Sequence, residues 1–439
     1  MLLYILGILV VVVGLAVSIG LHEVGHLLPA KLFGVRVSQY MIGFGPTIFS
    51  RKRGETEYGF KAIPLGGYIA MAGMYPPGKA NDKGRTATTG IFQTLVQDAR
   101  TASADTLVDV DESRAFYNLP VYKRVIIMLG GPLMNLLIGI VMFAILLMGF
   151  GIPQTTTTIS SVSECVIPAT ADRQACESTD PEAPGYAAGM LPGDRLVSMN
   201  GESVNSWAEA TEYIRAAAGD ELTVVVERDG QNLTLVTEPL LTERYVLDDR
   251  GQIVENANGE PQTEEYGFLG IGSAVDTVQQ PVAAVLPAVG DNVAAVGNVI
   301  LHLPQRMIDV AGAAFGPGDR DPNGPIGVVG VGRIAGEIAS LDSAPVADRI
   351  ASLIGLIGSL NVALFVFNLV PLMPLDGGHI LGALFEGVRR FFAKLFGKPD
   401  PGPVDTAKII PLTLVVVVLL GAMTLLLVYA DIVKPISFF

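Results

Sequence analysis

The stretch that decides the fold is LLYILGILVVVVGLAVSIGLHEVGH, residues 2–26. Residues 2–20 carry no charge and are long enough to cross about 30 Å of hydrocarbon as a helix. His22, Glu23 and His26 follow at once. Because ionisable side chains at membrane depth are costly, their presence there indicates a functional site.

The rest of the composition also indicates a membrane protein. The 439 residues are 50% hydrophobic and only 16% charged, which is more apolar than a soluble protein of this size. Apolar runs near residues 2–28, 125–152, 350–373 and 408–430 predict a polytopic α-helical membrane protein with about four transmembrane helices. The first run lacks the basic start and small-residue end of a cleavable signal peptide, so we expect it to be retained.

Charge predicts the orientation in a cytoplasmic membrane. Basic residues flank three of the runs: Lys31, Arg36, Arg51, Lys52, Arg53, Lys61, Lys123, Arg124, Arg389, Arg390, Lys394 and Lys398. These flanks are expected in the cytoplasm. Residues 151–280 hold 22 Asp and Glu against six Arg and no Lys, which predicts an extracytoplasmic block and argues against a nucleic-acid partner. The lipid bilayer is the expected surrounding.

The acidic block has the pattern of a small α+β domain. Strands are predicted at 155–162 and before the Asn200-Gly201 turn, a helix after Ser206, and a hairpin that turns at Asp229-Gly230. The stretch APGYAAGMLPGDRLVSMNGESV, residues 183–204, resembles a bacterial PDZ domain. Two roles stay open for it, peptide binding by strand addition and steric filtering of what reaches the membrane.

The chain has two cysteines, Cys165 and Cys176, and both lie in this block. Because an oxidising compartment outside the membrane allows a disulfide, we expect them to be joined; two free thiols are the alternative.

His22, Glu23 and His26 form the H-E-x-x-H pattern of zinc peptidases. Residues four apart stack on one face of a helix, so both imidazoles can reach one Zn²⁺ ion. Zinc lowers the pKa of a bound water to about 7, and the adjacent carboxylate can accept its proton. The alternative is a pair of histidines that snorkel toward the headgroups. Asp376 and His379 are both open as a third ligand on chemistry alone, whereas the context of His302 is typical of a structural residue.

Together with NLVPLMPLDGGHI, residues 368–380, this pattern resembles the site-2 protease family of intramembrane zinc metalloproteases. Asn368, Pro371, Pro374, Leu375, Asp376 and Gly377 occupy the positions of the family's second motif. The resemblance implies that Asp376 is the third ligand of one Zn²⁺ per chain. It also implies that Asn368 binds the substrate backbone, beside Pro371 and Pro374.

Three further stretches are similar to family elements. LGGPLMN, residues 129–135, is similar to a Gly-Pro-x-x-Asn element, residues 41–73 to a hairpin that dips into the membrane, and GPIGVVG, residues 324–330, to a segment before the third span. Gly66, Gly67 and Asn135 therefore join the expected substrate-binding residues. A helix-to-helix hydrogen bond is the alternative for both Asn135 and Asn368.

The resemblance is to the single-PDZ branch of bacterial regulator-of-sigma-factor proteases. It implies cleavage of transmembrane helices of single-pass substrates such as anti-sigma factors, after their outer domains are trimmed, at a site toward the cytoplasmic side. A non-proteolytic zinc-bearing receptor that binds peptides through the PDZ-like domain is the alternative, and Glu23 argues against it because a structural zinc site needs no base. A metal transporter is disfavoured because its ligands normally come from several spans.

The expected layout follows the chain in nine segments. They are a first span with the histidines (1–34), a re-entrant β-hairpin (35–75), a polar and partly disordered cytoplasmic insertion (76–120), a second span (121–152), the PDZ-like domain (153–277), an amphipathic segment (278–345), a third span (346–385), a cytoplasmic loop (386–407) and a fourth span (408–439). Residues 279–316 are expected to lie on the membrane surface as amphipathic helix, with a fifth span as the alternative.

Overall fold

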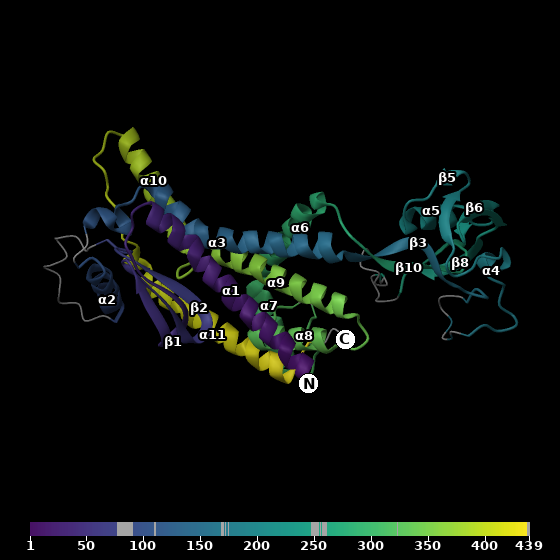
Figure 1. Ribbon diagram of the computed structural model, residues 1–439, viewed down its shortest axis with the longest axis horizontal. Helices are drawn as coiled ribbons and strands as arrows, with labels where there is room; N and C mark the ends of the chain where they lie inside the picture. Colours follow the sequence, from purple (N-terminus) through teal and green to yellow (C-terminus); the bar gives the residue numbers. More distant parts are fainter. Residues whose placement is uncertain are drawn as a thin grey trace. The chain divides into compact units, whose positions relative to one another are not determined.

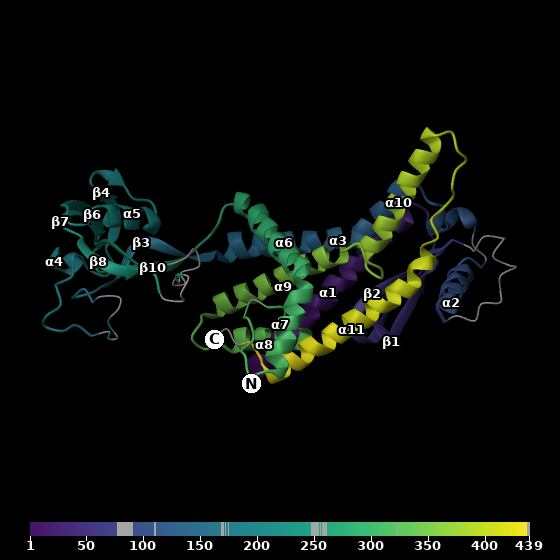
Figure 2. The same ribbon diagram turned by 180° about the vertical axis from the view of Figure 1, so that it is seen from behind.

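The structure is a computed structural model, described here for residues 1–76, 91–108, 111–167, 171, 173, 175–246, 254, 256, 261–322 and 324–436. The chain divides into two compact units (Figures 1 and 2). The helical unit comprises Met1–Phe150 and Gln280–Phe439, and the acidic unit comprises Gly151–Gln279. The acidic unit therefore extends two residues beyond the predicted domain at each end.

Within the described residues, five helices are long and apolar enough to cross a membrane. They are α1 (Leu2–Leu32), α3 (Val121–Ala144) with η4 (Ile145–Phe150), η5 (Val282–Ala284) with α6 (Val285–Leu301), α9 (Val346–Asn368), and η6 (Thr406–Ile409) with α11 (Ile410–Val433). Four of them coincide with the apolar runs of the sequence.

The fifth candidate span, which includes α6, lies in the segment for which a fifth span was the alternative to a surface helix. The sequence pattern placed this segment on the membrane surface because proline and glycine interrupt it. The prolines do not break the helices, because Pro287 lies in the first turn of α6 and Pro304 in the first turn of α7 (Leu303–Phe315). A proline in the first turn lacks only an N–H that has no partner within the helix.

The helix α1 is the centre of the helical unit. It packs against α3, α8 (Val328–Ser340), α9 and both strands of the hairpin (Figures 1 and 2). It crosses α3 at short range, where a Cβ added at Gly25 or at Gly130 would clash with the carbonyl group of the other glycine. Small residues permit such close helix crossings in membranes. This crossing brings the segment that contains His26 against the first half of α3.

The hairpin consists of β1 (Val37–Arg53) and β2 (Thr56–Met71), two long antiparallel strands. Residues 37–42 pair with residues 67–71 on one side and with residues 57–60 on the other, since Tyr40 opposes both Ile69 and Tyr58. The sheet therefore has four segments in the order 67–71, 37–42, 57–60 and 50–53. Gly66, with φ +113°, permits the bend that turns residues 67–71 into an edge segment.

The polar insertion, expected to be partly disordered, contains three helices in its described part. It forms α2 (Ile91–Asp105), η2 (Glu112–Arg114) and η3 (Phe116–Asn118). Two hydrogen bonds hold the C-terminal end of α2 against the segment that follows β2. Ser103 Oγ accepts from Tyr75 N at 3.0 Å, and Thr106 Oγ1, in the residue after α2, accepts from Gly73 N at 3.0 Å. Residues 77–90 and 109–110, which belong to the same expectation, lie outside the described residues.

The helix α10 (Asp376–Leu395) continues ten residues beyond the boundary expected at 385. Nothing in the sequence breaks it before Gly397, which has φ +64° and is followed by Pro399. A buried ion pair anchors the helix, since Arg124 on α3 donates to Glu386 at 2.5 Å. The expected loop therefore begins near residue 396.

A second buried ion pair fixes the end of α11. Arg320, in the loop after α7, donates to Asp431 at 2.7 Å, and both side chains are almost fully buried. Asp431 also accepts from Gly330 N at 2.8 Å, near the start of α8. These contacts connect α11 to α8, which packs on α1.

The acidic unit is built on a twisted antiparallel sheet. Its elements are β3 (Ile152–Val162), α4 (Pro184–Ala187), β4 (Arg195–Met199), β5 (Glu202–Ser203), α5 (Trp207–Ala216), β6 (Leu222–Arg228), β7 (Gln231–Thr237), β8 (Leu240–Tyr245), β9 (Thr263–Phe268) and β10 (Ile271–Val278). The main sheet has the order β10-β3-β4-β6-β7, with β5 on β4, while β8 and β9 form a separate pair.

The local signals of the acidic unit were predicted correctly up to β7. The Ser206 side chain accepts from Glu209 N at 3.2 Å and caps α5, and Asp229 and Gly230 turn the β6–β7 hairpin with φ of +52° and +77°. Buried Asp194 accepts two hydrogen bonds from Arg228, which holds the pKa of Asp194 below its usual value. The strands β8 to β10 were not predicted.

Candidate active site

The two histidines of the first helix and the aspartate of the second motif meet in the helical unit. His22 and His26 lie on α1, and their Nε2 atoms are 3.1 Å apart. Asp376 is the first residue of α10, and its Oδ2 lies 3.4 Å from each of these nitrogens. The three side chains form a group that can hold a metal ion.

The spacing of these atoms fits a tetrahedral zinc site. With Zn–N and Zn–O distances near 2.0–2.2 Å, ligand atoms at the corners of a tetrahedron are about 3.3–3.6 Å apart. The observed separations of 3.1, 3.4 and 3.4 Å are close to this range. Asp376 Oδ2 is buried and has no hydrogen-bond partner among the described residues, so a cation would satisfy it. Two imidazoles and one carboxylate are a donor set that suits zinc.

Glu23 lies directly beside this group. Its side chain is 8% exposed and interacts electrostatically with His22, His26 and Asp376. The carboxylate forms no hydrogen bond with the described residues. It is therefore free to contact a water molecule or substrate at the site, as a general base must.

One face of α3 supports the two histidines. The Ile127 carbonyl accepts a hydrogen bond from His26 Nδ1 at 2.7 Å, which directs Nε2 toward the site. A Cβ added at Gly131 would clash with His26 Nε2 and lie 2.7 Å from His22 Nε2. Asn135, one turn further, approaches His22 Nδ1 at 3.2 Å. Residues 127, 131 and 135 thus form a stripe on the helix that faces the histidines.

The hairpin borders the same site. A Cβ added at Gly67 would lie 2.9 Å from Glu23 Cγ, so this part of β2 contacts α1. Tyr40 on β1 donates to the Gly20 carbonyl at 2.7 Å and fastens the sheet to α1. Of the two glycines expected from the family resemblance, Gly67 therefore lies beside Glu23, whereas a Cβ added at Gly66 would clash with the Phe44 ring. Tyr40 was missed, and nothing in its sequence context distinguishes it.

The remaining residues of the second motif shape the connection between α9 and α10. Asn368 ends α9, is half-buried, and makes no side-chain hydrogen bond with the described residues. Pro371 and Pro374 are exposed. A Cβ added at Gly377 would clash with the Leu369 and Val370 carbonyls, so the chain folds back tightly here. This fold places Asp376 at the start of α10.

The other two histidines are outside the group. His379, the rival third ligand, instead lines a small cavity together with Arg124 and Glu386. His302 caps α6 and its Nδ1 donates to the Asn298 carbonyl at 2.9 Å.

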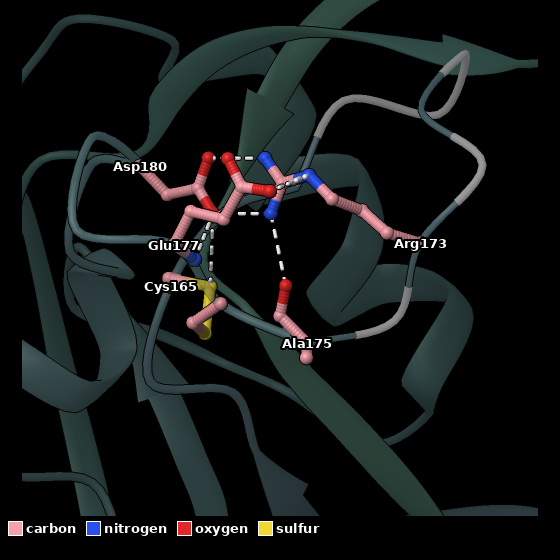
Figure 3. The surroundings of a disulfide bond; sticks show 6 residues. Cys165, Arg173, Ala175, Glu177 and Asp180 are labelled. Carbon is pink, nitrogen blue, oxygen red and sulfur yellow. Dashed lines mark hydrogen bonds and ion pairs between the residues drawn. A yellow bond between two sulfur atoms is a disulfide. The ribbon is translucent and has the colours of Figure 1, made fainter.

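A disulfide joins Cys165 and Cys176 (Figure 3). The sequence analysis favours a disulfide between these two cysteines. Arg173, within the loop that the disulfide closes, donates to both carboxylate oxygens of Asp180 at 2.5–2.6 Å. This pairing, with a hydrogen bond from Glu177 N, lowers the pKa of Asp180 to about 2. The disulfide lies in the acidic unit and contributes no ligand to the group of His22, His26 and Asp376.

Comparison with known proteins gives consistent matches. The model of peptidase family M50 matches residues 10–398. The sequence is 33% identical over 445 aligned residues to the zinc metalloprotease Rip1 of Mycobacterium tuberculosis, with 100% of both chains covered. It is 32% identical to Rip1 of Mycolicibacterium smegmatis over 99% of both chains. The metalloprotease MmpA of Caulobacter vibrioides is 27% identical over 86% of this chain and 85% of its own.

Proposed function

Because the chain belongs to peptidase family M50, the site-2 protease family of membrane zinc metalloproteases, we propose that His22, His26 and Asp376 hold its zinc ion. The observation that carries the assignment is the separation of their three ligand atoms, 3.1–3.4 Å. The family members to which the chain is similar are metalloproteases, which argues against the receptor alternative.

Glu23 acts as the general base and then as the general acid. Zinc, when bound, polarises a water molecule and the scissile carbonyl. Glu23 accepts a proton from the water as the water oxygen bonds to the carbonyl carbon. The C–N bond then breaks, and Glu23 delivers the proton to the leaving amine nitrogen. The products are two peptide fragments.

The substrate is a transmembrane helix that unwinds locally. A helix keeps its carbonyls inside its own hydrogen-bond ladder, so attack requires an extended strand. The edge segment 67–71 has a strand partner on one side, residues 37–42, and lies beside Glu23. An unwound substrate adds to its other side by backbone hydrogen bonds, with the hairpin reaching into the membrane from the cytoplasmic side. The Asn368 amide, which makes no hydrogen bond with the described residues, holds a further freed backbone group.

The substrates are single-pass membrane proteins of the anti-sigma type, trimmed of their outer domains beforehand. Lysine and arginine around α1, α3 and α10 support an active site toward the cytoplasm, and the net charge of −16 on residues 151–280 supports an acidic unit outside the membrane. The acidic unit, PDZ-like in its sequence and in its strand and helix order, acts there as a filter that excludes untrimmed substrates.

Metal analysis of ligand variants tests the zinc assignment. Purified wild-type chain is expected to hold one zinc, and His22→Ala and Asp376→Ala to lose it. His379→Ala is the matched control and is expected to keep it, because His379 lies outside the ligand group. Loss of zinc in the His379 variant together with retention in the Asp376 variant would reverse the assignment.

Cleavage assays test the substrate roles. Asn368→Ala is expected to slow cleavage of a trimmed single-span helix while zinc content stays at one per chain. Deletion of residues 155–275 is expected to speed cleavage of an untrimmed substrate and to leave a trimmed one unaffected. An unchanged rate on the untrimmed substrate would refute the filter.

A further inference from the structure

The asparagine of the α3 stripe has an unusual position for a residue that binds substrate. Asn135 is 1% exposed, so a substrate chain has almost no access to it. Its amide contacts His22, with Nδ2 at 3.2 Å from Nδ1, and its Oδ1 is buried without a partner among the described residues. The side chain therefore faces the far side of the His22 ring from Asp376.

The Nδ1 atoms of His22 and His26 each meet a polar group of α3. A histidine that binds a metal through one ring nitrogen usually donates the other N–H to an oxygen, which fixes its orientation and raises its basicity as a ligand. His26 has such an oxygen in the Ile127 carbonyl, 2.7 Å from Nδ1. Among the described residues, Asn135 is the group that meets Nδ1 of His22.

The chemistry of the amide supplies the missing acceptor. When Nε2 of His22 is a metal ligand, the ring proton is on Nδ1, and an N–H facing the Asn135 NH₂ group would pair two donors. A half-turn of the amide exchanges the positions of Oδ1 and Nδ2 with almost no change in shape. The oxygen then lies at hydrogen-bond distance from the Nδ1 proton.

We propose that Asn135 is a positioning residue that accepts a hydrogen bond from His22 Nδ1 and thereby holds Nε2 toward the metal. The helix α3 thus orients both histidines, one through a backbone carbonyl at Ile127 and one through a side chain two turns later. This inference rests on the proposed role of His22 as a zinc ligand, and it replaces the expectation that Asn135 binds substrate.

The test is the zinc dissociation constant of the purified full-length chain in detergent, measured by competition with a chelator. Asn135→Ala is expected to weaken zinc binding about 10–100-fold, the usual cost of losing such a partner. Asn135→Asp keeps an acceptor oxygen and is expected to restore binding.

Asn361→Ala is the matched control. Asn361 on α9 is also fully buried. It donates at 3.0 Å to the Oγ of Ser18, which lies on α1 one turn before His22, but it contacts none of the zinc ligands. This variant is expected to bind zinc as the wild type does. Melting temperatures of all variants in chelator show whether the metal-free chains are equally folded.

Each outcome bears on the proposal. Wild-type zinc affinity in Asn135→Ala, no restoration by Asn135→Asp, or an equal loss in Asn361→Ala would overturn it. His22→Ala separates this result from the proposed function. If that variant keeps its zinc, the ligand assignment itself is wrong, whereas if it loses zinc and Asn135→Ala does not, the positioning role alone fails.

Discussion

Gly131 lies at the point where a single methyl group can empty the metal site. A Cβ at this position would clash with His26 Nε2 and lie 2.7 Å from His22 Nε2, whereas ordinary contacts begin at 3.4 Å. The His22 ring would have to retreat by about 0.7 Å, and metal sites tolerate only about 0.2 Å. The neighbouring Gly130 is fixed against Gly25, so the helix cannot move away. Gly131→Ala should therefore weaken zinc binding more than about 100-fold, beyond the usual cost of losing one outer partner.

The assay is zinc competition on purified full-length chain, with Gly421→Ala as the control. Gly421 is also a glycine within an apolar helix, α11, but an added Cβ there has no neighbour within 4 Å. The control should bind zinc normally. Melting in chelator shows whether Gly131→Ala still folds, so that a loss of zinc binding can be told from a loss of structure. Zinc affinity in Gly131→Ala equal to that of wild type would refute the geometry of the site.

Two further predictions concern ion pairs. Asp431→Ala leaves Arg320 buried without its partner and should cost about 3–5 kcal/mol of stability, measured as a lower melting temperature in detergent. Replacing both residues by apolar ones should recover most of the lost stability. A double variant as unstable as Asp431→Ala would contradict this account of the ion pair. The Arg173 pair holds the pKa of Asp180 at about 2 instead of 3.8, so its stabilisation is complete above pH 3.8 and is lost as pH falls toward 2. The melting difference between wild type and Arg173→Ala should therefore be constant above about pH 4 and disappear near pH 2, whereas a constant difference down to pH 2 would exclude this linkage.

Residue spacing alone predicted much of the site. His22 and His26 are on one helix, so their separation of four residues is enough to place them on one face. Asp376 is more than 300 residues away, and only a known motif identified it as their partner. Chemistry alone could not decide between Asp376 and His379, because the turn before α10 determines which side chain meets the histidines.

The features that were missed depend on tertiary contacts. Asn135 carries a polar group in an apolar helix, which indicates a function but not whether it faces a substrate or a ligand. The pairs Arg124–Glu386 and Arg320–Asp431 join residues more than 100 positions apart, and the sequence gives no sign of their proximity. The helix α2 was not predicted within the polar insertion, and the hydrogen bonds of Ser103 and Thr106 that dock its C-terminal end join it to residues before the insertion.

The most direct test of the central claim is cleavage of a trimmed, single-span anti-sigma-type helix by the purified chain in detergent, with Glu23→Gln in parallel and zinc measured in both. The amide of the variant cannot accept a proton but preserves the size of the side chain. The proposed mechanism predicts that the wild type cuts, and that the variant holds one zinc per chain without cutting. Cleavage by the zinc-loaded variant at the wild-type rate would contradict the role of Glu23 as the base.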